Sequence, residues 1–283
     1  MPSLVKYFSA LKDSRIQFGC LFKKQNQLNY INVRANEFTN NDLEALRVKF
    51  QPAPEGHVIP NEKIEKFPEQ YVCPRINRDM LSKEGFKVQE ISNFSDVQTF
   101  FNKLHIVTRN SPGIPESRTD ALVDDLFRVT RLNKYPLEIV PQLPCKLYIF
   151  NKPYVSAKPD FLITKGIISM IIVEDKTLQN ADRFNTYGET QMAAELLACG
   201  NENIRKDDEI TDQVLFAVRF ISTYTTFYKA DIPVSYWKEL NNGLPKRNSI
   251  KIKRWPGENY KKSGLDLADP GGRKAVLTAL AKI

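Results

Sequence analysis

Histidine is scarce in this chain, which contains two, His57 and His105. A catalytic zinc site built on three histidines would need more than the chain holds. A Ser-His-Asp triad would have to use one of these two, and the sequence has no Gly-x-Ser-x-Gly motif, which holds the nucleophile of α/β-hydrolases. These absences disfavour both an enzyme with histidine-bound catalytic zinc and a hydrolase with a serine nucleophile.

Cysteine is also scarce, and its spacing is uninformative. The four residues lie far apart with no Cys-x-x-Cys pair: Cys20, Cys73, Cys145 and Cys199. Thiolate zinc sites usually show such a pair. Scattered cysteines in a chain of 283 residues are typical of reduced thiols in an intracellular protein. We therefore expect any metal to bind carboxylates, which suit Mg²⁺ or Mn²⁺.

Long apolar segments are missing as well. No apolar run approaches the ~20 residues that span a bilayer, so we expect no membrane partner. The segment up to Arg15 lacks the apolar region and cleavage site of a secretory signal. The expectation is an intracellular protein without a secretory signal.

Positive charge is what the chain has in excess. It contains 41 Lys and Arg against 33 Asp and Glu, for a net charge of +8. This excess favours a polyanionic partner, with nucleic acid ahead of an anionic membrane surface. Seventeen Phe and eleven Tyr argue against disorder, and the length suits one large domain or two small ones.

The first hundred residues have a weak pattern. Strands are predicted over 16–22 and 28–33, a helix after Asn40-Asn41-Asp42, and another helix over 93–104. Prolines make 51–75 a loop and a soft boundary. We expect an N-terminal α+β region of unknown role over 1–100 and a second domain over 101–283.

The pattern is clearer after residue 111. Helices are predicted over 116–132, over 183–198 with a C-cap at Gly200, and over 273–282. Strands are predicted over 146–150, 154–164, 167–176, 214–221 and 225–229, the second and third forming a hairpin around Gly166. This order predicts an α/β fold with a mixed central β-sheet flanked by helices.

Charged residues stand at the open end of that hairpin. Glu174 follows an almost entirely apolar strand, where a lone carboxylate would be costly unless it is paired or bound to metal. Lys176 points to the same face of the strand as Glu174, because side chains alternate along a strand. If the hairpin turns at Gly166, Asp160 on the first strand lies next to this end of the second strand. Two carboxylates beside one lysine would hold a divalent cation and place an ammonium group next to it, an arrangement that fits phosphodiester hydrolysis.

These residues resemble the PD-(D/E)xK nuclease motif, with Pro159-Asp160 followed by Glu174-Asp175-Lys176. The resemblance covers about 115–283 and implies a restriction-endonuclease-like core. It implies that Asp160, Glu174 and Glu116 bind Mg²⁺ or Mn²⁺ and that Lys176 lies beside the attacking water. It adds Gln191 on the following helix to the catalytic set.

Within that superfamily, the chain looks most like the nuclease-type C-terminal domains of Crinkler effectors and related fungal proteins. The segments that suggest this include the helix start at Glu116-Ser117-Arg118 and the closing Arg254-Trp255-Pro256. The first hundred residues do not resemble the ubiquitin-like header of those effectors. The implied activity is metal-dependent hydrolysis of DNA, or of RNA, by an activated water.

A basic tract near the C-terminus has three interpretations. Its cations are Lys246, Arg247, Lys251, Lys253 and Arg254. They suit an edge that binds a nucleic-acid backbone, with Trp255 near for stacking. They also suit a nuclear-targeting tract, or an edge strand over 249–253 protected by its charges. Arg118 and Lys158 are further candidates for contacts to nucleic acid.

Each site residue also has an ordinary structural interpretation. Glu174 and Lys176 could form an ion pair at a solvated rim. Asp160 could cap a turn, and Glu116 could complement a helix dipole. Gln191 could be a satisfied interior amide. The alternative to a nuclease is an inactive nuclease-fold module that binds nucleic acid or a protein partner.

Overall fold

The fold is seen in a computed structural model that describes residues 31–109, 115–176, 186–207 and 210–283, without the side chains of Glu174, Asp175 and Asp207. The strands predicted over 16–22 and 28–33 and the predicted start of a helix at 183 lie wholly or largely outside the described residues. No described helix is long and apolar enough to cross a membrane.

A mixed sheet forms the centre of the described part, in the order β1-β9-β8-β7-β6-β5-β2, with β10 paired to β8. The pairs β1–β9 and β6–β7 are parallel, and the others are antiparallel. A separate two-stranded sheet joins β3 and β4. The strands are β1 (Val48–Pro52), β2 (Leu137–Pro141), β3 (Cys145–Ile149), β4 (Lys152–Ala157), β5 (Phe161–Lys165), β6 (Ile168–Lys176), β7 (Gln213–Ile221), β8 (Tyr224–Ile232), β9 (Ile250–Trp255) and β10 (Leu265–Asp266).

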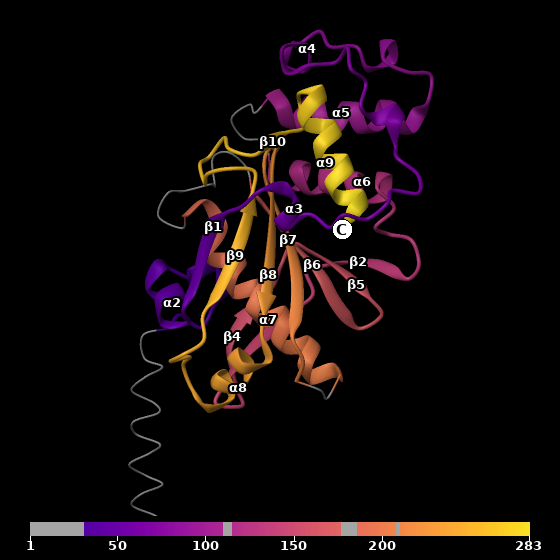
Figure 1. The fold of residues 1–283 in the computed structure, drawn as a ribbon. Helices are drawn as coiled ribbons and strands as arrows, with labels where there is room; N and C mark the ends of the chain where they lie inside the picture. The colour runs from indigo at the N-terminus through magenta and orange to yellow at the C-terminus, as the bar shows by residue number, and fades with distance from the viewer. Residues whose placement is uncertain (1–30, 110–114, 177–185, 208–209) are drawn as a thin grey trace, which may run out of the picture.

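Helices cover both faces of this sheet, as the α/β prediction required (Figure 1). The α-helices are α2 (Asn40–Ala45), α3 (Glu55–Val58), α4 (Arg78–Ser82), α5 (Ser95–Arg109), α6 (Ser117–Val129), α7 (Glu189–Asp207), α8 (Val234–Asn242) and α9 (Pro270–Lys282). Short 3₁₀ turns are η1 (Ala35–Glu37), η2 (Glu69–Tyr71), η3 (Val88–Glu90) and η4 (Thr186–Gly188).

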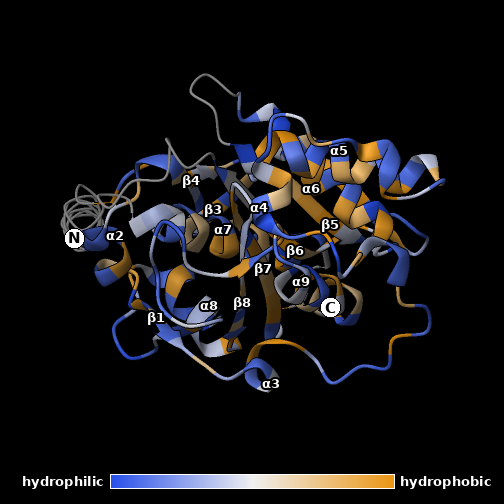
Figure 2. Ribbon diagram, turned by 90° about the horizontal axis from the view of Figure 1, so that it is seen from above, coloured by the Kyte–Doolittle hydropathy of each residue, from blue (hydrophilic) through white to orange (hydrophobic). Residues whose placement is uncertain are grey.

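The alternation of strand side chains separates two hydrophobic cores. Ile172 of β6 packs with α7, α8 and the β3–β4 sheet, whereas Ile171 and Val173 pack with α5, α6 and α9. Figure 2 shows the central strands largely hydrophobic between helices of mixed colour. The buried stripe of α6, which includes Leu122 and Phe127, was predicted from its spacing and is confirmed.

The strand predicted over 154–164 is wrong, because the structure divides it into β4 and β5. β4 pairs with β3, and β5 pairs with β6. The break lies at Lys158-Pro159-Asp160. Proline has no N–H for a strand ladder, so a break beside Pro159 has a direct cause. Lys158 therefore lies in the connection between two sheets and not within a hairpin strand.

The C-cap predicted at Gly200 is wrong, since α7 continues to Asp207. A Cβ at position 200 would lie 2.9 Å from Cδ1 of Leu215 and 3.0 Å from Cζ2 of Trp237. The glycine thus allows α7 to pack closely on β7 and α8. Helix C-caps and close helix contacts both select glycine, and the sequence alone did not separate these roles.

The described residues before position 100 belong to the same sheet and cores as those after it. The boundary expected at residue 100 falls inside α5, and β1 lies next to β9. β9 is therefore interior, which contradicts the interpretation of 249–253 as an edge strand. Arg78 joins α4 to β10 through two hydrogen bonds of 2.7 Å to Asp266.

A buried arginine fastens α9 to the segment around residue 72. Arg273 has no exposed surface and donates to the carbonyls of Val72, Cys73, Ile76, Leu267 and Ala268 at 2.7–3.2 Å. Burial lowers its pKa to about 10, so the guanidinium stays charged at neutral pH.

We expect Arg273→Met to lower the free energy of unfolding by about 3 kcal/mol or more, because these buried carbonyls lose their donor. Urea denaturation measures the loss. Lys274→Met, at the exposed neighbouring position, should change stability by less than about 0.5 kcal/mol. Equal effects of the two substitutions would contradict a structural role for the buried guanidinium.

Candidate active site

The end of β6 meets the first turn of α7 through a side-chain contact. Lys176 Nζ donates to Gln191 Oε1 at 3.4 Å, and both residues are half-buried. Gln191 Nε2 in turn donates to Glu195 Oε1 at 3.0 Å, one helical turn further on. Glu195 has no exposed surface. The amide of Gln191 is thereby oriented with its carbonyl oxygen toward the lysine.

The backbone brings Asp160 to the same end of the sheet. Phe161 is opposite Val173 in the β5–β6 ladder, so Asp160 and Glu174 occupy the next position on each chain. The N–H of Gln142 donates to the Asp160 carbonyl at 3.0 Å and extends the β2–β5 pairing past the end of β5. Asp160 is half-buried, while the side chain of Glu174 lies outside the described part.

A kinked turn at the start of α7 packs against the lysine. Tyr187 and Gly188 have φ angles of 53° and 89°. A Cβ added to Gly188 would lie 3.2 Å from Cε of Lys176 and 3.8 Å from Cδ of Arg219. The missing side chain at Gly188 therefore gives the stem of Lys176 its space.

Arg219 holds this turn in place, and sequence reasoning missed it. Its Nη1 donates to the Tyr187 carbonyl at 2.8 Å and to Asn259 Oδ1 at 2.7 Å. Asn259 Nδ2 donates to the Thr186 carbonyl at 2.7 Å. Arg219 is fully buried on β7, opposite Glu174 in the backbone ladder. The sequence did contain a signal for Arg219, because it is the one charged residue in the apolar run 214–221. A charge buried in such a strand must have partners inside the protein.

A buried ion pair anchors Glu189, the first residue of α7. Glu189 Oε1 accepts from Arg254 Nη1 at 2.6 Å and from the Tyr228 hydroxyl at 3.1 Å. Burial raises the pKa of Tyr228 well above its usual value. The Arg254 side chain is 9% exposed, so we remove it from the residues expected to contact nucleic acid. Its charge is matched within the protein.

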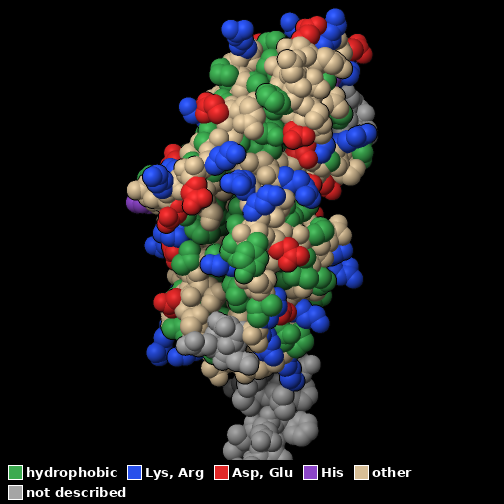
Figure 3. All heavy atoms as spheres, turned by 90° about the vertical axis from the view of Figure 1, so that its right-hand side faces the viewer, with side chains coloured by type: hydrophobic (Ala, Val, Ile, Leu, Met, Phe, Trp, Pro, Cys, Tyr) green, Lys and Arg blue, Asp and Glu red, His purple; other side chains and the backbone are tan. Residues whose placement is uncertain are grey.

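The other predicted cations lie at separate places on the surface. Arg118 in the first turn of α6, Lys158, Lys246, Arg247 and Lys251 are exposed. Lys253 is half-buried, and its Nζ lies 2.8 Å from Asp231 Oδ2. On the face shown in Figure 3, Lys and Arg side chains form a band with Asp and Glu side chains interspersed.

Glu116 lies immediately before α6 and is half-buried. Its carbonyl accepts from the N–H groups of Thr119 and Asp120 at 2.7 and 3.1 Å, so it forms the N-cap. The described side chains, which do not include that of Glu174, contain no group of three or more His, Cys, Asp or Glu that could hold a metal ion.

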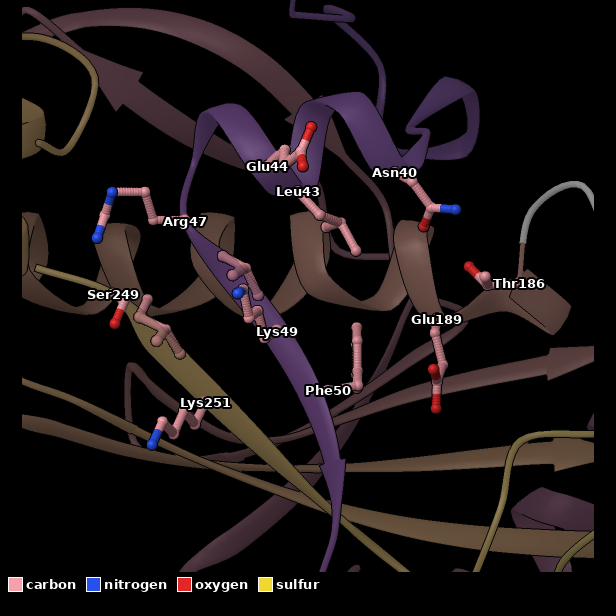
Figure 4. A pocket seen from close by; sticks show the side chains of 12 residues that line it. Asn40, Leu43, Glu44, Arg47, Lys49, Phe50, Thr186, Glu189, Ser249 and Lys251 are labelled. Carbon is pink, nitrogen blue, oxygen red and sulfur yellow. The ribbon is translucent and has the colours of Figure 1, made fainter.

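A separate cavity of about 690 Å³ lies between α2, β1, β9 and the start of α7 (Figure 4). Cations line one part of it, including Arg47, Lys49 and Lys251, and Glu189 lines another. Its lining residues do not include Asp160, Lys176 or Gln191. The predicted catalytic residues therefore do not use this cavity, despite its size.

No protein-family model matches the chain, and a search of curated proteins finds no similar sequence.

We expect Gly188→Ala and Gly166→Ala each to lower the free energy of unfolding by about 1–2 kcal/mol, because both glycines have positive φ. A Cβ at Gly166 would meet no atom within 4 Å, whereas one at Gly188 would press on Lys176. Mass spectrometry can follow the rate at which an acylating reagent modifies the Lys176 amine. Compared with the wild-type protein, this rate should change in Gly188→Ala and should not change in Gly166→Ala. Equal rates in the two variants would refute the packing role.

Proposed function

We propose that the protein is a metal-dependent nuclease of the PD-(D/E)xK type, acting on DNA or RNA. The order of elements supports a restriction-endonuclease-like core. α6 precedes the antiparallel β5–β6 hairpin, and α7 connects β6 to the parallel β7, which pairs with β8. The net charge of +8 suits a polyanionic substrate.

The contact between Lys176 and Gln191 is the observation on which this proposal depends. These residues come from different elements, and the resemblance required both beside one site. The β5–β6 register adds Asp160 at the same end of the sheet. A random match to a short motif would not predict that its lysine contacts a glutamine of the following helix.

The donor set suits a hard divalent cation. Residues directly opposite each other on two antiparallel strands have Cβ atoms about 4.5–5.5 Å apart. This separation lets their two carboxylates share one cation. Asp160 and Glu174 occupy such positions, and carboxylate oxygens are the ligands that Mg²⁺ prefers. We assign these two residues, with Glu116 directly or through water, to Mg²⁺ or Mn²⁺.

The residues of this chain then have separate roles. A bound Mg²⁺ would polarise the phosphoryl oxygen and lower the pKa of a coordinated water. Lys176 would orient that water or stabilise the negative charge that develops on the phosphate. Gln191 would fix the position of the ammonium group, because its own amide is held by Glu195.

We expect the purified protein to cleave DNA when Mg²⁺ or Mn²⁺ is present. Lys176→Ala and Asp160→Asn should each lower the cleavage rate by about 100-fold or more, because each removes a group acting at the phosphate. Lys165→Ala removes an exposed cation at the opposite end of β5 and should retain activity.

Undiminished cleavage by Lys176→Ala would refute the assignment. DNA binding that weakens steeply with salt, without cleavage under either metal, would instead favour the inactive nuclease-fold module.

Metal binding can be tested without activity. A crystal soaked in Mn²⁺ should show anomalous density beside the carboxylates of Asp160 and Glu174, because these residues supply the oxygen ligands. The density should disappear in Asp160→Asn, which keeps the shape of the side chain and removes its charge. Density of equal height in this variant would exclude Asp160 as a ligand.

A further inference from the structure

A groove of about 440 Å³ opens beside the candidate active site. Its volume is within the ~300–1,000 Å³ typical of sites for small molecules. Four segments line it, and none of their lining residues is a motif acid; Pro144 is apolar, and the other three segments supply polar side chains. They contribute Arg34 and Asn36, then Ser156 and Lys158, then Gln191 and Glu195.

Backbone bonds fasten the first of these segments to the second. Arg34 and Ser156 form a parallel β-bridge, and the Ser156 N–H donates to the Val33 carbonyl at 2.9 Å. The Ser156 hydroxyl donates to the same carbonyl at 3.2 Å. Backbone hydrogen bonding therefore fixes Arg34 beside Ser156 at the groove.

A buried carboxylate braces the segment from the other side. Asp42 accepts from the N–H and side-chain amide of Asn32 at 2.7 and 2.9 Å, and from the hydroxyl of Thr39 at 2.7 Å. Burial raises the pKa of Asp42, but these hydrogen bonds outweigh burial and leave the pKa below its usual value. The charged form of Asp42 thus fixes the chain on both sides of Arg34.

The groove is continuous with the site through its floor. Gln191 lines the groove and also contacts Lys176, so a ligand lying here would reach the residues assigned to catalysis. Buried Glu195 lies beside Gln191 on the same floor.

Cations and neutral donors surround the opening. The Arg34 side chain is 68% exposed, and its ion pair with Glu37 measures 3.4 Å. An exposed pair of this kind contributes little, so the guanidinium can exchange partners readily. Lys158 is exposed, and exposed Asn36 adds a side-chain amide. The Ser156 hydroxyl already donates to the Val33 carbonyl and is not counted among these donors. Arginine, lysine, amide and hydroxyl groups are the usual contacts of phosphate oxygens.

We propose that this groove binds the sugar-phosphate backbone of the substrate strand next to the scissile phosphate, with Arg34 and Lys158 contacting its phosphates. This inference rests on the proposed function and names a substrate subsite for it. Arg34 is new to the set of functional residues. For Lys158, the proposal specifies where it would contact nucleic acid. Lys158 lies in the connection between β4 and β5, beside Pro159, and lines the groove.

The test uses fluorescence anisotropy of a short labelled DNA, as single strand and as duplex, with Ca²⁺ replacing Mg²⁺ to limit cleavage. The variant is Arg34→Gln with Lys158→Gln, which removes two exposed charges. The matched control is Arg131→Gln with Lys134→Gln, two exposed cations in the α6–β2 connection and outside the groove. Thermal unfolding verifies that both double variants fold.

We expect the groove variant to bind at least one form of DNA about 10-fold more weakly. Its slope of log affinity against log salt should fall by about 1.4 for single strands or 1.8 for duplex, which corresponds to two lost phosphate contacts. The control should change affinity less than about 2-fold. Equal losses in both variants, or a loss in neither, would overturn the proposal. Equal competition by polyglutamate would also overturn it, because the groove would then bind acidic chains in general.

Cleavage assays separate this proposal from the nuclease assignment. If the wild-type protein binds DNA through the groove and never cleaves with Mg²⁺ or Mn²⁺, the subsite stands and the nuclease does not. If it cleaves, and the groove variant keeps the same KM and kcat, the nuclease stands and the subsite does not.

Discussion

The docking of α7 onto the end of β6 is the constraint on which the candidate site depends. Lys176 on the strand contacts Gln191 on the helix, and the kinked turn before the helix packs against the lysine through Gly188. Arg219 holds that turn from below, and the ion pair between Glu189 and Arg254 holds its continuation from the side. A change in the start of α7 would therefore alter the contact between the lysine and the glutamine.

Buried guanidinium groups do much of this positioning. Burying a charge is costly unless hydrogen bonds match it, so a buried arginine requires its surroundings to have one geometry. Arg254 meets a carboxylate, and Arg273 meets backbone carbonyls. Arg219 donates through Nη1 and lies 5.7 Å from the centre of the Tyr228 ring, but in the described part its Nε and Nη2 have no hydrogen-bond partner. Among the described residues, Arg219 is thus the one of the three with two guanidinium nitrogens that have no partner, and like Lys176 it lies against Gly188.

The sheet explains how residues far apart in the chain share one site. Asp160 reaches the end of β6 through antiparallel register, whereas Gln191 arrives through the crossover helix that joins β6 to β7. Arg34 arrives from the N-terminal part of the chain through a bridge to β4. Three different connections therefore converge on the region where Lys176 ends its strand. The proposed catalytic groups and the proposed substrate groove follow from the same topology.

Local patterns in the sequence determined the elements that depend on near neighbours. The apolar stripe of α6, the turn at Gly166 and the apolar strand ending near Lys176 were all predictable, because periodicity and turn residues act within a few positions. The same reading of the strands placed Asp160, Glu174 and Lys176 at one end of the hairpin, and the resemblance to the PD-(D/E)xK motif added Gln191 and Glu116. Tertiary structure decided the place of β1 beside β9, the passage of α7 through Gly200 and the burial of Arg254. The reason is that each of these outcomes depends on a partner far away in the chain, and no local pattern specifies which partner that is.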